Sequence, residues 1–190
     1  MIRAALVLVS MLGGVAAADH DHQSKKDRLR VLKSPKHGPP PRPGTKPAKL
    51  INIFNSWTDE WLAVEAPPSP KAETVNRFLR DHFTNEPSTM EPKLIGFVVA
   101  AATKFRSDTA IVVSAFRHPK YNLMLRKKGR QVARDSAHTH GNAVDFYIPR
   151  IATATLHAWA KAQGAGGVGL YLESGFVHMD TGNVRYWSGD

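Results

Sequence analysis

Two short segments in the C-terminal half of the chain alternate so regularly that they restrict the fold more than any other feature. If residues 143–148 (AVDFYI) are extended, three apolar side chains share one face, and Asp145 lies on the other face. In residues 175–182 (GFVHMDTG), the same rule places His178 and Asp180 on one face, with two apolar residues behind them. We therefore expect two strands, each with a core face and a polar face.

The remaining pattern of apolar residues adds helices and further strands. A hairpin is expected over residues 49–64, with a polar turn at Asn55 to Asp59. Helical spacing predicts helices over residues 71–83, 92–105 and 151–164, and a short basic helix or turn over 117–129. Strand-like runs lie at 109–116, 166–173 and 183–187. This order predicts an α+β fold, with an antiparallel sheet and helices packed on it.

The first 18 residues have the features of a secretory signal peptide. An apolar run from Ala4 to Val15 follows one arginine and precedes three alanines. The run is shorter than the ~20 residues that span a bilayer, which disfavours the alternative of an uncleaved anchor. We expect the mature chain to be exported, to the periplasm or cell wall.

Residues 19–49 differ in composition from the rest of the chain. The stretch 23–49 holds nine Lys or Arg against one Asp, together with six prolines. Such a segment has too little apolar surface to fold, and we expect a disordered basic tether. It could make weak electrostatic contact with an anionic wall or membrane surface, or serve only as a linker. Residues 50–190, the expected domain, carry sixteen Lys or Arg against thirteen Asp or Glu, and no nucleic-acid motif accompanies the charge.

The chain contains no cysteine. Disulfides and thiolate metal sites are therefore excluded, and a metal site would need nitrogen and oxygen ligands. His138, Asp145 and His178 together would supply two imidazoles and one carboxylate, which leave coordination positions open for water and substrate. Each residue alone is weak support, because single histidines in strands usually form ordinary hydrogen bonds. The three become a candidate metal site because they fall on compatible elements.

A family resemblance makes the interpretation more specific. The segment SAHTHGNAVD matches the pattern SxHxxGxAxD of the zinc D-Ala-D-Ala carboxypeptidases and murein endopeptidases, which are sometimes grouped by fold with the signalling domain of hedgehog. All five positions of the pattern are filled, by Ser136, His138, Gly141, Ala143 and Asp145.

The resemblance extends over residues 50–188 and is greatest to the branch that contains murein endopeptidase K. NRFLRDHFTNEPSTMEPKLI resembles the helix pair of that branch, SAFRHPKYN its SGYRSPxxN segment, and GGVGLYLESGFVHMDTGNVRYW its closing strands. It implies zinc bound by His138, Asp145 and His178, with Arg117 near the substrate or the developing oxyanion. A zinc-activated water would attack a peptide carbonyl.

The general base is where the chain departs from the carboxypeptidase pattern. Those relatives have a glutamate three residues before the last zinc histidine, and here that position is Gly175. Asp180 and Glu173 are the two candidates. We favour Asp180, because strand alternation places it beside His178, whereas Glu173 would have to reach in from a turn. The alternative for Asp180 is that it orients a ligand histidine.

Four residues are expected at the substrate: Arg117, Ser136, His140 and Asn122. Each has a structural alternative: an ion pair for Arg117, a local hydrogen bond for Ser136, an exposed loop position for His140 and helix packing for Asn122. No GxSxG motif surrounds any serine, which excludes a serine hydrolase of that type.

The sequence thus predicts an exported zinc metallopeptidase that hydrolyses amide bonds in peptidoglycan stem peptides or cross-links. One alternative is a noncatalytic wall-binding domain with a structural zinc. Another is a non-heme iron oxygenase, whose ligand set also has two histidines and a carboxylate. The sequence favours neither endopeptidase nor carboxypeptidase cleavage and indicates no oligomeric state.

Overall fold

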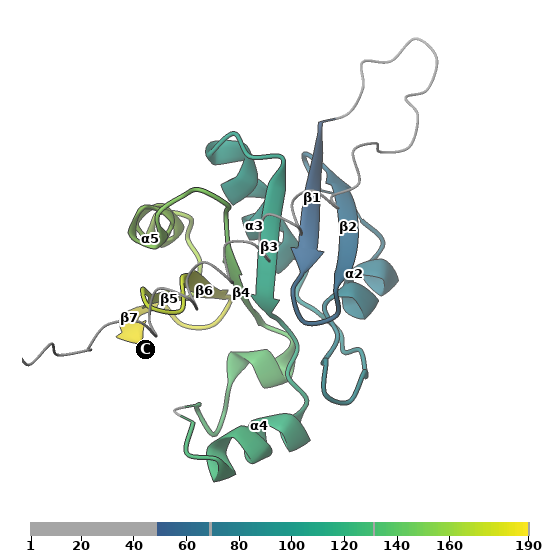
Figure 1. Ribbon diagram of the computed structural model, residues 1–190, viewed down its shortest axis with the longest axis vertical. Helices are drawn as coiled ribbons and strands as arrows, with labels where there is room; N and C mark the ends of the chain where they lie inside the picture. The colour runs from purple at the N-terminus through teal and green to yellow at the C-terminus, as the bar shows by residue number, and fades with distance from the viewer. Residues whose placement is uncertain (1–48, 69, 131, 190) are drawn as a thin grey trace, which may run out of the picture. The chain divides into compact units, whose positions relative to one another are not determined.

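The computed structural model describes residues 49–68, 70–130 and 132–189 (Figure 1). The predicted signal peptide and all but the last residue of the predicted tether lie outside these ranges. None of the helices in the described ranges is long and apolar enough to cross a membrane.

Seven strands form one sheet in the order β2-β1-β3-β4-β6-β5-β7. Their bounds are β1 Leu50–Asn55, β2 Glu60–Glu65, β3 Thr109–Ser114, β4 Ala143–Tyr147, β5 Gly167–Tyr171, β6 Phe176–Asp180 and β7 Arg185–Gly189. The predicted hairpin is β1 paired with β2. Both alternating segments of the sequence, β4 and β6, are inner strands and pair with each other.

The expectation of an antiparallel sheet is wrong in two places. β3 pairs with β1 in the parallel direction, after the chain has passed through β2 and two helices, α2 (Ala72–Phe78) and α3 (Lys93–Lys104). A connection of that length allows a parallel pair. β7 pairs in parallel with β5, because β4 and β5 already occupy the two edges of β6. The fold is α+β, and its sheet is mixed.

The predicted helices are present, and two are shorter than expected, because α5 spans Thr153–Lys161 instead of 151–164 and α2 also ends early. Helix α2 ends at Phe78 instead of residue 83. Asp81 ends the helical pattern there, since its carboxylate accepts hydrogen bonds from the backbone N–H of Thr84 at 2.7 Å and of His118 at 3.1 Å. The remaining helical elements are α4 Pro119–Lys127, the 3₁₀ turn η1 Ala137–His140 and α5 Thr153–Lys161.

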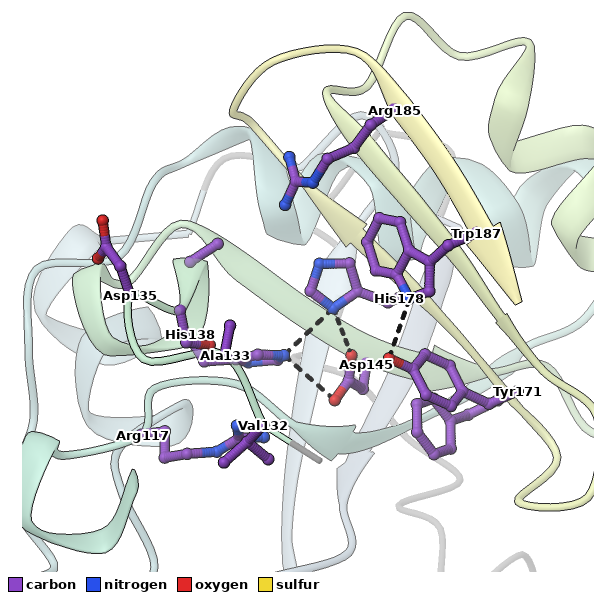
Figure 2. Close-up of a pocket in the computed structure, with 13 residues that line it drawn as sticks. Arg117, Val132, Ala133, Asp135, His138, Asp145, Tyr171, His178, Arg185 and Trp187 are labelled. Atoms are coloured by element: carbon purple, nitrogen blue, oxygen red, sulfur yellow. Dashed lines mark hydrogen bonds and ion pairs between the residues drawn. The ribbon is translucent and has the colours of Figure 1, made fainter. Parts of the chain in front are cut away.

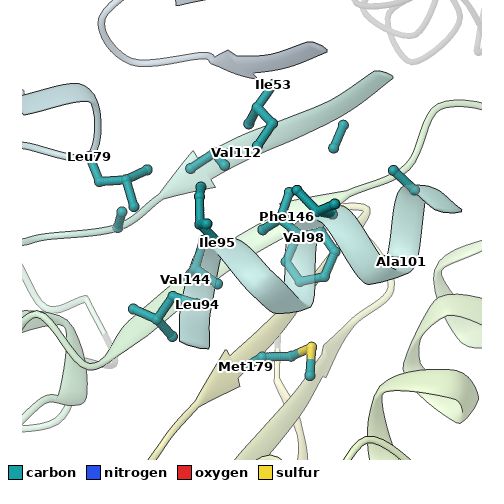
Figure 3. Packing of buried hydrophobic residues seen from close by; sticks show 14 of the residues in the cluster. Ile53, Leu79, Leu94, Ile95, Val98, Ala101, Val112, Val144, Phe146 and Met179 are labelled. Atoms are coloured by element: carbon teal, nitrogen blue, oxygen red, sulfur yellow. The ribbon is translucent and has the colours of Figure 1, made fainter. Parts of the chain in front are cut away.

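The hydrophobic core lies on one face of the sheet. Helix α3 packs across β3, β4 and β6, and α5 packs on β5 and β6. Figure 3 shows Val144 and Phe146 of β4 packed against Leu94, Ile95 and Val98 of α3. The alternation predicted for β4 is confirmed, because Val144, Phe146 and Ile148 are fully buried in this cluster. The opposite face of β4 and β6 is therefore the place for polar groups.

Candidate metal centre

The polar face of β4 and β6 brings two of the predicted ligands together. The antiparallel register pairs Asp145 directly with His178, and Ala143 with Asp180. Directly opposite residues on one face have their Cβ atoms about 5 Å apart, which is close enough for a carboxylate to meet an imidazole. Next to this pair, the register of β3 against β4 shifts between Val112 and Ser114, a bulge of the kind found beside functional sites.

His138 reaches the same place from η1. The backbone N–H of Arg117 donates to the carbonyl oxygen of His138 at 3.1 Å and ties the turn to the end of β3. The turn closes at Gly141, which has φ +71°, and a Cβ on this residue would lie 2.2 Å from the carbonyl oxygen of Thr89. Only glycine fits both constraints. The glycine of the SxHxxGxAxD pattern thus shapes the turn that presents His138.

The three side chains form a closed triangle of donor atoms (Figure 2). Nδ1 of His178 lies 2.8 Å from Oδ1 of Asp145, and Nε2 of His138 lies 3.2 Å from Oδ2 of Asp145. The two imidazole nitrogens are 3.2 Å apart. Ligands of a tetrahedral ion at ~2.1 Å are roughly 3.4 Å from one another. All three residues are buried, and their donor atoms fit around one ion.

In each histidine, the ring nitrogen that points away from the triangle contacts an oxygen atom, and this contact holds the ring in place. Nδ1 of His138 donates to the carbonyl oxygen of Ala115 at 2.7 Å, because a carbonyl can only accept. Nε2 of His178 lies 3.0 Å from Oδ2 of Asp180. These contacts fix which nitrogen of each ring faces the triangle, an arrangement typical of histidines that ligate metals.

Asp180, the favoured candidate for the general base, is fully buried and already fully engaged. Its Oδ2 accepts from Nη2 of Arg185 at 2.6 Å as well as contacting His178. Its Oδ1 accepts from the backbone N–H of Gly167 at 2.7 Å and of Gly182 at 2.8 Å. The carboxylate therefore lies behind His178, on the side away from Asp145.

The charges of these groups support one another. Burial opposes the charged form of His178, but hydrogen bonds to Asp145 and Asp180 raise its pKa to about 9. Burial alone would raise the pKa of Asp145, yet His138 and His178 outweigh it and hold that pKa well below its usual value. Burial lowers the pKa of His138. Metals bind an ionised carboxylate and a neutral imidazole, so Asp145 and His138 already favour the metal-binding form, whereas a metal would have to displace a proton from His178.

The triangle lies in a pocket of about 410 Å³. Six further residues that line it are Arg117, Ser136, Tyr171, Phe176, Arg185 and Trp187. Two predicted substrate residues, Arg117 and Ser136, are thus at the pocket. Nη2 of Arg117 is 3.5 Å from the hydroxyl of Ser114, and Figure 2 shows the Arg117 side chain below the donor triangle.

An aromatic wall on one side of the pocket was not predicted. Tyr171 stacks on Phe176 with ring centroids 4.6 Å apart, and its hydroxyl accepts from Nε1 of Trp187 at 3.1 Å. A Cβ on Gly169 would lie 2.5 Å from the Trp187 ring, so any larger residue at this strand position would displace the ring. The signal in the sequence was the pattern GGVGLY, because alternate glycines in a strand mark a close approach by another group.

Three other predicted site residues do not line the pocket. Glu173 lies in the turn between β5 and β6 and is exposed. Nε2 of His140 contacts Oδ1 of Asp135 at 2.6 Å, with both side chains exposed. Asn122 is buried, and its side-chain amide donates to the carbonyl oxygen of Ala133 at 3.0 Å.

Fold and site together define a class: an α+β protein with a buried His, His, carboxylate set open to a pocket. The chain belongs to the peptidase family whose profile, described as Peptidoglycan L,D-endopeptidase MepK, matches residues 51–187. Similar proteins include the Peptidoglycan L,D-endopeptidase MepK of Escherichia coli (strain K12), 36% identical over 114 residues. That match covers 60% of this chain and 63% of the relative, so the chain spans less than two thirds of the relative's length.

A second relative matches over more of its length. The Probable peptidoglycan L,D-endopeptidase MepK of Haemophilus influenzae is 29% identical over 151 residues, which cover 78% of this chain and 81% of the relative. No solved structure matches the chain at a significant level.

Proposed function

We propose that the chain is a zinc-dependent peptidoglycan endopeptidase that cleaves L,D bonds between stem peptides. The donor triangle of His138, Asp145 and His178 carries this proposal, because it is buried, held from behind and open to a pocket. The names of the relatives supply the polymer and the type of bond. Membership in a peptidase family makes the proposed reaction peptide hydrolysis.

Zinc suits the donor set better than other common ions. Two imidazoles and one carboxylate, without thiolates, are typical of catalytic zinc sites that keep one position open. When bound, zinc would polarise the scissile carbonyl and lower the pKa of its coordinated water toward ~7. His138 would bind it through Nε2 and His178 through Nδ1, since the other nitrogens contact Ala115 and Asp180.

We assign the remaining polar groups of the pocket to orientation and charge. Arg117 would bind the carbonyl oxygen as negative charge develops on it, because its guanidinium lies at the pocket beside the donor triangle. Asp180 would orient His178, because Arg185 and two backbone N–H groups already occupy its oxygens. The wall of Tyr171, Phe176 and Trp187 would hold the apolar part of the peptide and exclude water.

The proposed substrate requires export, and the N-terminal segment agrees with that. Peptidoglycan lies outside the cytoplasmic membrane, so a leader over residues 1–18 would bring the enzyme to its substrate. The basic segment 19–49 would then hold the domain near anionic wall or membrane surfaces.

The proposal is tested on the full chain with purified peptidoglycan and with soluble cross-linked stem peptides. Product masses identify the cleaved bond, and metal analysis after native purification identifies the ion. We expect zinc at one ion per chain, loss of turnover with a chelator and recovery when zinc is added. His138→Ala should abolish turnover, whereas the matched control His157→Ala, on the distant helix α5, should not.

Other results would overturn the proposal in recognisable ways. Iron in place of zinc would support the oxygenase alternative. Zinc without turnover on either substrate would support a noncatalytic wall-binding domain. Full hydrolysis by His138→Ala would exclude the donor triangle as the catalytic centre.

A further inference from the structure

An exposed cluster of aromatic rings lies outside the pocket. Trp57 stacks on His82 with centroids 4.0 Å apart, His82 meets the edge of Tyr121 at 4.7 Å, and Tyr121 stacks on Phe83 at 5.4 Å. These four residues, called here the aromatic ridge, come from the β1–β2 turn, the loop after α2 and helix α4. The outer rings are open to solvent: Trp57 is 50% exposed and Phe83 54%. Contiguous exposed rings of this kind mark interaction sites.

The ridge is held in place by the backbone around it. The buried side chain of Asn55 donates to the carbonyl oxygen of Phe78 at 2.7 Å and accepts from the N–H of Trp57 at 3.0 Å. The β1–β2 turn is thereby tied to the end of α2. A surface held in this way loses little conformational entropy when it binds a partner.

Helix α4 adds positive charge next to the rings. Residues 117–134 contain seven Lys or Arg and no Asp or Glu, almost half of the cations in residues 50–190. Lys120, Leu123 and Lys127 recur on one exposed face of α4. None of the lysines of this segment has an ion-pair partner within the described ranges. An unpaired group of cations favours an anionic partner.

A backbone hydrogen bond links the loop that carries two of the ridge residues to the segment that carries Arg117. The backbone N–H of Phe116 donates to the carbonyl oxygen of Leu79 at 3.0 Å, which joins the loop of His82 to the segment that carries Arg117. Burial lowers the pKa of His82, Asp81 opposes this, and the nearby charge of Arg117 lowers it further. Arg117, which lines the pocket, is therefore near enough to His82 of the ridge to affect its pKa.

The chemistry of this surface fits a sugar polymer with acidic substituents. Sugar rings present C–H faces that pack on aromatic rings, and hydroxyls that need planar hydrogen-bonding groups at the edge. Planar polar groups lie close in sequence to the ridge residues, because Arg80 contacts Glu60 of β2 at 2.6 Å and Oδ1 of Asn85 at 2.6 Å.

We propose that the aromatic ridge and the basic face of α4 bind a glycan strand of peptidoglycan and the carboxylates of its uncleaved stem peptides. The inference rests on the proposed function and extends it, because one strand would then run from the ridge past Arg117 to the peptide in the pocket. Figure 1 shows the β1–β2 turn below its two strands, with α4 lower still in the view. The pocket would select the bond, and the ridge would select polymer over free peptide.

The test compares two substrates for the full chain: intact insoluble peptidoglycan, and soluble cross-linked stem peptides without sugars. Trp57→Ala combined with Phe83→Ala should reduce hydrolysis of the intact polymer about tenfold and leave the soluble peptide unchanged. Phe83→Leu, which keeps apolar volume but removes a ring, should give a smaller loss on the polymer alone. Tyr186→Ala is the matched control, since this ring is 53% exposed on β7.

A second pair of variants tests the charge. Lys120→Ala with Lys127→Ala should weaken co-sedimentation with intact peptidoglycan about threefold at low salt and hardly at all in 1 M salt. Lys93→Ala with Lys104→Ala, two exposed lysines of α3, is the control and should bind like the parent. Equal melting temperatures establish that all variants are folded.

Several outcomes overturn the inference. Ridge variants that cleave intact polymer at the parental rate exclude it, and so does an equal loss on both substrates. Ridge variants that lose binding to phosphatidylglycerol vesicles but still bind the polymer would show that the surface binds membranes instead. If the parent cleaves neither substrate, the proposed function fails, and co-sedimentation of the ridge variants still decides whether the ridge binds the polymer.

Discussion

The two faces of strands β4 and β6 are buried to similar degrees but stabilised differently. On one face, Val144, Phe146 and Met179 are fully buried among apolar side chains of the core. On the other face, Asp145 and His178 are also buried, and hydrogen bonds satisfy their polar atoms. The comparison teaches that neighbouring positions along one strand can serve stability and chemistry separately, because side chains alternate across a sheet.

The largest effect is expected for Asp145→Asn, on the polar face. The amide cannot supply the charged oxygen that the donor triangle uses, so zinc binding and hydrolysis should fall by about 10³ or more. Zinc content and rates on soluble cross-linked peptides measure this. The far-UV circular dichroism should remain that of a folded chain. A variant that holds zinc and works at the parental rate would contradict the assignment.

Phe146→Ala removes a ring from the core face of the same strand, β4. Removing a fully buried ring should lower the free energy of unfolding by about 3 to 5 kcal/mol, because a cavity forms beneath α3. Urea denaturation measures this. The fraction that remains folded should bind zinc like the parent. If zinc affinity fell as much as for Asp145→Asn, the two faces would not be separable.

Asp180→Asn sharpens the comparison, since this residue is buried on the polar face without belonging to the triangle. We expect zinc affinity to fall about 10- to 100-fold, because the support behind His178 weakens. In the zinc-free protein, the pKa of His178 should fall from about 9, because the carboxylate charge that stabilises the imidazolium is lost. NMR titration and chelator competition measure the two effects. Zinc affinity equal to the parent with activity abolished would instead support Asp180 as the general base.

Gly169→Ala introduces a side chain where the polar face meets β7. The new Cβ would lie 2.5 Å from the ring of Trp187, so we expect a cost of about 1 to 3 kcal/mol in unfolding free energy as the aromatic wall shifts. Thermal or urea unfolding measures it. Gly96→Ala on α3 is the matched control, because nothing lies within 4 Å of its added Cβ. Equal stabilities of the two variants would contradict the packing described for Trp187.

The smallest effect is expected for Glu173→Gln. Its side chain is exposed in the β5–β6 turn and does not line the pocket, so the rate on soluble peptides should stay within about twofold of the parent. Steady-state kinetics measure this. A large drop would mean that Glu173 reaches the reacting atoms and serves as the general base.

Strand alternation predicted which face of its strand each polar residue of β4 and β6 occupies. The pattern of residues 143–148 fixed the face of Asp145, and the same rule paired His178 with Asp180, because both depend only on neighbouring residues. The contact between Asp145 and His178 depends on the register of β4 against β6, which local spacing does not determine. The three ligands were proposed because they fall on compatible elements, and the family resemblance implied the same set of His138, Asp145 and His178.

Long-range pairing explains what sequence reasoning missed. The parallel pair of β1 and β3 depends on where the α2–α3 connection returns, and α2 stops early because Asp81 bonds to residues far along the chain. For Asp180 we favour the role of orienting His178, because Arg185 on β7 contacts its Oδ2 at 2.6 Å, a pairing that local spacing does not reveal. Trp187 entered the pocket only because β7 pairs with β5 across from Gly169.

The position of β6 in the sheet determines when the donor triangle can form during synthesis of the chain. Among the strands of the described residues, β6 is next to last in sequence order but lies inside the sheet, between β4 and β5. It also carries His178. The donor triangle of His138, Asp145 and His178 can therefore form only after the chain has been synthesised past β6, and a nascent chain that ends before this strand lacks the proposed metal site.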